Sequence, residues 1–204
     1  MKFIETRKEL RELYAAPSEL VVRKQLAALD PHSKRFLTKS PFVLIGSQGA
    51  SGHGDVTPKG DGPGFVAVLD DVTIAIPDRP GNNRIDTWEN LIENPAVGLL
   101  FLIPGMNETL RINGDARLTA DADLCARLAM NGRPALAALV VNVREVYMHC
   151  AKAFIRSALW KSDNWPDRSE MPTLGEIVRD QLALAESASA IDDHLAEIYR
   201  KTLW

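Results

Sequence analysis

The spacing of hydrophobic residues changes twice along the chain. Up to about residue 38 the apolar positions recur at helical spacing, with Val22, Leu26 and Leu29 at i, i+4 and i+7. From about residue 42 to residue 148, short runs rich in β-forming residues replace that pattern. Helical spacing then returns, first in "AKAFIRSALW" and again over about 174–201. The pattern therefore predicts helices at both ends of the chain and a β-rich centre.

The central runs predict five or six strands in an antiparallel arrangement. Few connections between them are long enough for a helical crossover, which argues against a doubly wound parallel sheet. A barrel or sandwich with helical flanks fits better, so we expect a mainly β fold with helical flanks (α+β). The expected strands cover 42–47, two strands in 65–76 joined by an Asp70-Asp71 turn, 97–103, 109–120 with a bulge or bend at Gly114, and 138–148.

Two features of the connecting segments invite a functional interpretation. The first is the segment 46–64, which holds seven of the thirteen glycines. It does not match the phosphate-binding P-loop, because Lys59 is followed by Gly60 and Asp61 rather than by Ser or Thr. The segment is either a mobile hairpin loop or a stretch that holds Thr57 and Lys59 against a ligand, with the Lys59 ammonium free to reach an anion.

The second feature is the start of a short helix predicted over 84–92, just after "PGNN". Asn82 or Asn83 can cap this helix, and Asp86 suits its first turn. Arg84 then lies at the positive end of the helix dipole, where a cation is unfavourable by a few tenths of a kcal/mol. Either Arg84 points to solvent, or an anion such as a phosphate binds between its guanidinium and the free amides of the helix.

Composition removes several classes of function. The net charge of −3 gives no overall basic footprint for nucleic acid, and no apolar run reaches the length of a signal peptide or a membrane span. The four histidines show no metal-ligand spacing, and we expect no metal site. Cys125 and Cys150 do not form a CxxC pair, so we expect two buried thiols and a cytoplasmic, reducing environment. No acid–base or nucleophilic residue can be singled out, and the catalytic residues stay unknown.

Three segments in a fixed order resemble a known family. "PGNNR" after a strand, then "ENPAVGLLFLIPG" and "TLRINGDARL" resemble the flavin-binding split β-barrel of the pyridoxamine 5′-phosphate oxidase superfamily. More narrowly, the stretch 56–84 together with "HCAKAFIRSALW" is similar to an FMN-binding subgroup of that superfamily. The resemblance covers roughly residues 35–165. The oxidase's own Arg-x-x-x-x-Lys strand and its C-terminal Arg/His pattern are absent, so the resemblance does not extend to pyridoxamine phosphate as the substrate.

The resemblance implies a set of FMN contacts on one subunit. The turn before the short helix grips the FMN phosphate in the family, and the strand end ahead of it offers backbone groups to the isoalloxazine ring. Lys59 is implied as a second contact to the phosphate or the ring. The residues at the positions that match the turn and the strand end are Asn82, Asn83 and Arg84, and Ile76, Pro77 and Asp78.

Further contacts are implied on the next strand and on the helix that follows the barrel. Thr109 lies nearest the position whose polar side chain faces the flavin. These barrels are typically homodimers with FMN at the interface, so the segment 149–160 would supply contacts to the partner's flavin. On one helix, Lys152, Arg156 and Trp160 at i, i+4 and i+8 would share a face. The alternative is a solvated face with a core tryptophan.

These expectations combine into one prediction. The protein is a homodimeric FMN-binding split barrel, an FMN-dependent oxidoreductase with a small-molecule substrate and with no nucleic-acid or membrane partner. The alternatives are a non-enzymatic flavin-binding or sensing module, and a flavin or deazaflavin reductase on the same barrel. The expected organisation is a helical segment 1–40 packed on the barrel, the barrel 41–165, and a helical extension 166–204.

Overall fold

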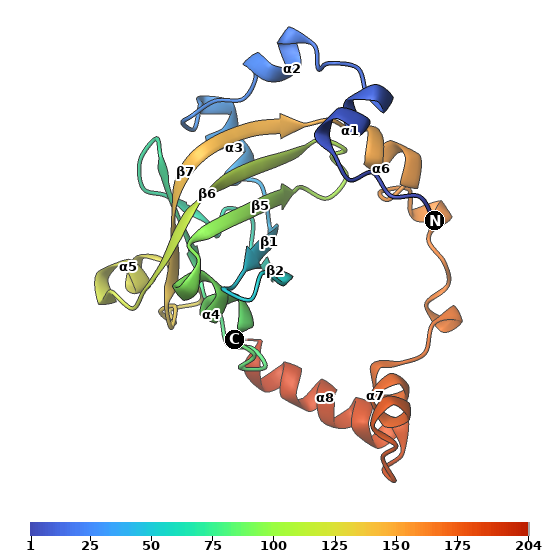
Figure 1. The fold of residues 1–204 in the computed structure, drawn as a ribbon. Coiled ribbons are helices and arrows are strands. Elements are labelled where there is room, and N and C mark those ends of the chain that lie inside the picture. The colour runs from blue at the N-terminus through green and yellow to red at the C-terminus, as the bar shows by residue number, and fades with distance from the viewer. Residues whose placement is uncertain (204) are drawn as a thin grey trace.

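A computed structural model describes residues 1–203 (Figure 1). Its centre is one antiparallel seven-stranded sheet with the order β2-β1-β5-β6-β7-β4-β3, which confirms the predicted fold class. The strands are β1 Phe42–Gln48, β2 Gly54–Gly60, β3 Ala67–Val68, β4 Thr73–Pro77, β5 Ala96–Leu102, β6 Thr109–Thr119 and β7 Ala138–His149.

Helices precede, interrupt and follow the sheet. They are α1 Arg7–Leu13, α2 Glu19–Arg23, α3 Pro31–Leu37, α4 Asp86–Glu93, α5 Ala122–Arg127, α6 Lys152–Ser157, α7 Leu174–Leu182 and α8 Ala188–Thr202, with 3-10 turns η1 Ser162–Asn164 and η2 Arg168–Glu170. Within the described chain, none of these helices has the length and apolar character that a membrane crossing requires.

The core lies on the inner face of the curved sheet. Alternate residues of β1, β5, β6 and β7 are fully buried there, as period-2 alternation requires. Helix α4 packs on this core through Trp88 and Leu91, and α3 does so through Phe36 and Leu37. The packing fixes both helices to the barrel, and it sets the position of the chain just before α4.

β2 is the strand at one end of the sheet, and β4 is next to the strand at the other end, β3. Among residues 1–203 no ladder joins β2 to β4; instead, ion pairs between the residues that end or follow these two strands form a seam. Lys59 Nζ lies 3.0 Å from Asp78 Oδ1, and Arg79 Nε lies 2.8 Å from Asp61 Oδ2. The barrel is therefore split, and side chains bridge the split.

Most strand predictions are confirmed. β1, β4, β5, β6 and β7 fall within one or two residues of their predicted ranges. Asp70 accepts a hydrogen bond from the Val72 amide in the turn between β3 and β4, and a register shift lies between Asn113 and Gly114. Asp121 caps α5 by accepting a hydrogen bond from the Leu124 amide, so the carboxylates at these turns act in local structure.

Three predictions about local structure are wrong. Helix α2 ends at Arg23, and Leu26 instead exchanges backbone hydrogen bonds with Val146 of β7. The glycine-rich segment is not a loop throughout, because β2 pairs with β1 along its whole length. Cys125 is buried as expected, but Cys150 is exposed.

Two predicted C-terminal helices are shorter than the sequence pattern suggested. α6 ends at Ser157 because Ala158 takes the left-handed conformation, with φ of 51°. Trp160 therefore lies beyond the helix and does not share a helical face with Lys152 and Arg156. The stretch 174–201 is likewise broken by Ala183, also at φ of 51°, into α7 and α8.

The two termini differ from the barrel in how they pack. Helices α1 and α2 contain no buried residue. Just after α2, Lys24 Nζ donates a 2.7 Å hydrogen bond to the Met148 carbonyl of β7. At the other end, α7 and α8 pack chiefly on each other and stand apart from the sheet (Figure 1).

Candidate functional site

The chain between β4 and α4 forms a tight turn at the split. Asn83 adopts the left-handed conformation with φ of 59°, and Asn82 Oδ1 accepts a 3.0 Å hydrogen bond from the Arg84 amide. Neither asparagine caps the helix: α4 begins at Asp86, and its N-cap Ile85 has no side-chain acceptor. The prediction of an asparagine cap is therefore wrong, and Arg84 lies just before the helix rather than in its first turn.

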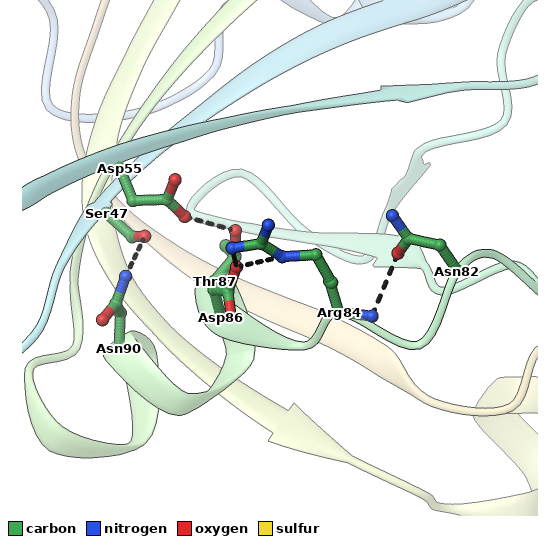
Figure 2. Close-up of polar contacts among 7 residues, drawn as sticks. All are labelled: Ser47, Asp55, Asn82, Arg84, Asp86, Thr87 and Asn90. Atoms are coloured by element: carbon green, nitrogen blue, oxygen red, sulfur yellow. Dashed lines mark hydrogen bonds and ion pairs between the residues drawn. The ribbon is translucent and has the colours of Figure 1, made fainter. Parts of the chain in front are cut away.

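Arg84 reaches forward to the first residue of the helix. Its guanidinium pairs with Asp86 Oδ2 at 3.0 Å from Nε and 2.8 Å from Nη2, as Figure 2 shows. The Arg84 side chain is 76% exposed. Asp86 is favourable in the first turn of a helix, so the pair offsets the unfavourable placement of the cation. Arg84 nevertheless remains accessible to a stronger anion.

The start of α4 also carries free backbone donors. Within residues 1–203, no acceptor hydrogen-bonds the amides of Ile85, Asp86 and Thr87. Free amides at a helix start, together with the helix dipole, favour binding of an anion such as a phosphate. The helix has eight residues and packs on the core, so these donors are held in place.

Two polar contacts anchor α4 to the sheet. Thr87 Oγ1 donates to Asp55 Oδ2 of β2 at 3.1 Å, and Asn90 Nδ2 donates to Ser47 Oγ of β1 at 3.2 Å (Figure 2). Thr87 and Ser47 are buried, where an unmade hydrogen bond costs about 1–3 kcal/mol. These contacts fix the helix start relative to the β2 side of the split.

Lys59 occupies the other side of the same site. Besides its pair with Asp78, its ammonium lies 4.5 Å from the centroid of the Trp88 ring, a cation–π distance. The ammonium is therefore not free, contrary to the sequence prediction. A pocket of about 70 Å³ is lined by Lys59, Asp78, Asn82, Asn83 and Arg84, and by Arg79, Pro80, Gly81, Ile85, Trp88 and Leu136.

The structure thus brings together one part of the predicted site. It adds Trp88, Arg79 and Leu136, which sequence reasoning missed. The sequence could have indicated Trp88, because it lies about one helical turn after Arg84. Leu136 lies in the loop before β7, and no local sequence pattern relates it to the site. Ile76 is fully buried and Pro77 pairs with Ala138 of β7, so these two can present only backbone groups to a ligand.

The remaining predicted residues lie at the far end of the barrel. Thr109 is buried and pairs with His149, whereas Pro77 pairs with Ala138 at the opposite end of β7. At about 3.3 Å per residue, the length of β7 corresponds to roughly 35 Å, which is longer than an FMN molecule. One flavin therefore cannot touch both groups of a single chain.

Near Thr109, α6 and the residues after it form a second cluster. Trp160 Nε1 donates a 2.8 Å hydrogen bond to the Met106 carbonyl, and its ring stacks on Phe154 at 5.8 Å. Lys152 and Arg156 are exposed, and within residues 1–203 neither side chain has a hydrogen-bond or ion-pair partner. The hydrogen bond of Trp160 ties the segment after α6 to the β5–β6 turn, and the two cations are exposed near this end of the barrel.

A hollow larger than the pocket at the split lies elsewhere on the barrel. A shallow groove of about 840 Å³ runs over the outer face of the sheet, and its lining includes Gly46 of β1, Gly98 of β5 and Asn113 of β6. Beside it, the paired residues Leu44 and Leu100 are only half-buried. None of the sequence-predicted site residues lines this groove.

The residues at the split suit the phosphate of a flavin mononucleotide. The three amides that have no acceptor within residues 1–203 and the exposed Arg84 guanidinium supply donors for a dianion, and the Lys59 ammonium, paired with Asp78, adds positive charge beside them. The pocket is large enough for a phosphate group but far below the roughly 300–1,000 Å³ of a complete ligand site. A flavin ring would need a second surface.

This arrangement, an antiparallel split barrel with a helix start at the split, defines the class of protein. The model for pyridoxamine 5′-phosphate oxidase matches residues 29–150, which is more than half of the chain. The chain therefore belongs to the pyridoxamine 5′-phosphate oxidase family, as the sequence resemblance implied. No curated protein matches the chain.

Several solved structures are similar in fold to this chain. A candidate pyridoxamine 5′-phosphate oxidase from Lactobacillus delbrueckii is 21% identical, with coverage of 61% of this chain and 98% of its own and a TM-score of 0.48. An FMN-binding protein from Syntrophomonas wolfei is 10% identical, with coverage of 70% and 96% and a TM-score of 0.45. An F420 reductase is 15% identical, with coverage of 59% and 98% and a TM-score of 0.43. With TM-scores below 0.5, none of these likenesses carries the functional argument.

Proposed function

We propose that the protein binds FMN with the phosphate at the start of α4, and that it is an FMN-dependent oxidoreductase acting on a small molecule. The observation that carries the proposal is the set of free amides at Ile85, Asp86 and Thr87 beside the exposed Arg84. Membership of the pyridoxamine 5′-phosphate oxidase family supports it.

The residues of the split have separate tasks in this proposal. Arg84 and the amides hold the phosphate, and Asp78 keeps Lys59 over Trp88 at the edge of the site. Leu136 and Ile85 give the site an exposed apolar rim. Bound flavin would supply hydride or electron transfer at its ring, whereas the protein binds and orients it.

The proposed active form is a homodimer. The pocket at the split is too small for a flavin ring, and Thr109, Lys152, Arg156 and Trp160 cannot reach the flavin of their own chain. In a two-fold dimer the far end of one barrel can approach the split of the other, and these residues would then complete the partner's site. The cytoplasm is the proposed compartment, because the exposed Cys150 is a free thiol.

The first experiment is flavin binding. Purified protein should be yellow and should release FMN on denaturation. The double variant Asn83→Ala/Arg84→Ala should lower FMN affinity by about an order of magnitude or more, since a charge-assisted hydrogen bond contributes about 1.5–3 kcal/mol. Arg23→Ala, at an exposed arginine on α2, is the matched control and should bind like the unmodified protein. A colourless protein that takes up no FMN would refute the proposal.

A second experiment separates an enzyme from a flavin carrier. Anaerobic addition of NADH should bleach the flavin bands if the protein is a reductase or oxidase that accepts nicotinamide electrons. A flavin that stays oxidised with NADH and NADPH would favour the flavin-binding or sensing module. Titration with a deazaflavin in place of FMN tests the remaining alternative, a deazaflavin reductase.

A further inference from the structure

The hairpin formed by α7 and α8 is a well-specified local structure. Thr173 caps α7 because its Oγ1 accepts a hydrogen bond from the Glu176 amide, and Ser187 caps α8 because its Oγ accepts one from the Ala190 amide. Gly175 lets the helices approach closely, because a Cβ there would collide with the Ala188 carbonyl, and its amide donates to Asp192 Oδ1 at 2.8 Å. Local signals that agree in this way indicate that the sequence specifies an ordered helical hairpin here.

This hairpin nevertheless lacks a core of its own. Its two helices have 9 and 15 residues, yet Ile191 is its only buried large apolar residue among those described, and even Ile191 is 8% exposed. Chains below about 40 residues rarely fold alone without further support. The hairpin exposes Leu174, Leu182, Leu184, Ile198 and Tyr199. A stable hairpin must therefore cover these side chains with another surface.

The tether that leads to the hairpin holds it away from its own barrel. Residues 158–173 carry two 3-10 turns with internal hydrogen bonds, including Trp165 Nε1 to the Leu159 carbonyl and the Asp167 cap on the Ser169 amide. Beyond Trp160 the tether is exposed throughout, including Trp165 and Met171. Figure 1 shows it running outward from α6 before α7 begins. The surface that covers the hairpin is thus not supplied nearby by the same chain.

The exposed area of the chain indicates how large the missing surface is. The accessible surface is 13963 Å² for a mass of 22.5 kDa. A compact monomer of this mass exposes about 9,500 Å², so the chain carries a surplus of about 4,500 Å². Obligate homodimers bury roughly 2,000–5,000 Å² or more in total, and burial of half the surplus of each chain would reach that range.

Other parts of the chain also expose apolar side chains that nothing in the same chain covers among residues 1–203. Helix α1 has seven residues, no buried side chain, and exposed apolar residues at Leu10 and Leu13. A helix so short is not stable in water unless it packs on something. The outer face of β1 and β5 leaves Leu44 and Leu100 half-covered. Apolar arms and an uncovered apolar sheet face on one chain are the two complementary halves of a self-association surface.

We propose that the α7–α8 hairpin is an exchanged arm that docks on a second copy of this chain. In a two-fold dimer, each arm would extend from its own barrel through the tether and pack on the barrel of the other copy. The inference goes beyond the flavin site, and it holds whether or not flavin binds.

The direct test uses the unmodified protein without flavin. Copies of natural isotope content and copies labelled with ¹⁵N are co-refolded from urea and treated with a lysine-reactive cross-linker. Cross-links between Lys201 of the arm and Lys34 of α3, which packs on the barrel, are then sorted by mass. Mixed-isotope cross-links are the expected result. Cross-links confined to copies of equal isotope content would overturn the proposal.

A variant pair tests the apolar contact. Sedimentation velocity should find dimers of the unmodified protein at micromolar concentration. Leu182→Glu/Ile198→Glu should raise the dimer dissociation constant by at least tenfold, with the near-ultraviolet circular dichroism of the barrel retained. The control Gln181→Glu/Ser189→Glu adds the same charges at polar, exposed positions and should dimerise normally. A monomeric unmodified protein, or an unchanged dissociation constant in the apolar variant, would contradict the proposal.

Discussion

The Arg79–Asp61 ion pair allows a quantitative test of how the split barrel is closed. The Asp61 side chain is only 1% exposed and that of Arg79 is 16% exposed, and Nε lies 2.8 Å from Oδ2. Arg79→Leu would leave the buried Asp61 carboxylate with the 2.6 Å hydrogen bond from the Gly62 amide as its one remaining partner within residues 1–203. Breaking one partner of a buried pair costs about 3–5 kcal/mol, so we expect a loss of that size in the free energy of unfolding.

The chain offers an internal control for this prediction. Arg84 and Asp86 form a second Arg–Asp pair at 2.8 Å, but their side chains are 76% and 50% exposed. Arg84→Leu should therefore cost at most about 1 kcal/mol. Urea unfolding, followed by fluorescence of the tryptophans, measures both variants under the same conditions.

A double variant separates the pair from the isolated charge. Asp61→Leu/Arg79→Leu removes both charges, and it should be less destabilised than the sum of the two single variants, because no unpaired buried charge remains. A loss below about 1 kcal/mol for Arg79→Leu, equal to that of Arg84→Leu, would refute the argument. Such a result would mean that water reaches Asp61 as freely as it reaches Asp86.

Three further predictions concern single positions. Asp86→Asn removes the carboxylate that pairs with the Arg84 guanidinium, so FMN should bind several-fold more tightly in a fluorescence titration. Weaker binding would place the phosphate elsewhere. Gly114→Ala should destabilise the protein by about 1–3 kcal/mol in thermal unfolding, because a Cβ there meets the backbone of β7, whereas Gly54→Ala, with open space around it, should be near neutral. Asp30→Ala removes the cap of α3 and should cost about 0.5–2 kcal/mol at pH 7. The hydrogen bond with the Ser33 side chain lowers the pKa of Asp30, against a smaller effect of burial, so this difference should persist at neutral pH and shrink as the pH falls below about 4; a constant difference down to pH 2 would exclude the charged cap.

The sequence predicted the barrel well where burial imposes a period. β1, β5 and β7 are apolar runs with one fully buried face, and their ranges agree with the structure. β2 could not be found in the same way, because it is an edge strand with no buried residue, and its half-buried positions are the polar Asp55, Thr57 and Lys59. Its pairing with β1 is a tertiary effect that no local pattern carries.

The candidate site was predicted in part for a similar reason. The helix start after "PGNN" is a local signal, and the structure places Arg84 and the free amides together there. The Lys59–Asp78 pair depends on closure of the barrel, which the sequence does not reveal, and so Lys59 was expected to be free. The end of α6 at Ala158 was missed because alanine normally favours a helix and gives no stop signal.

Stability and flavin binding should be coupled at the split. Arg79, whose ion pair with Asp61 joins the two edges, is followed directly by the turn that carries Asn82, Asn83 and Arg84. Loss of this ion pair would let the turn move, and the position of Arg84 relative to the free amides would no longer be fixed. Arg79→Leu should therefore weaken FMN binding even in conditions where nearly all of the protein is folded, although Arg79 need not touch the phosphate. Equal FMN affinity in the folded Arg79→Leu variant and in the unmodified protein would show that the turn keeps its conformation without the Arg79–Asp61 ion pair.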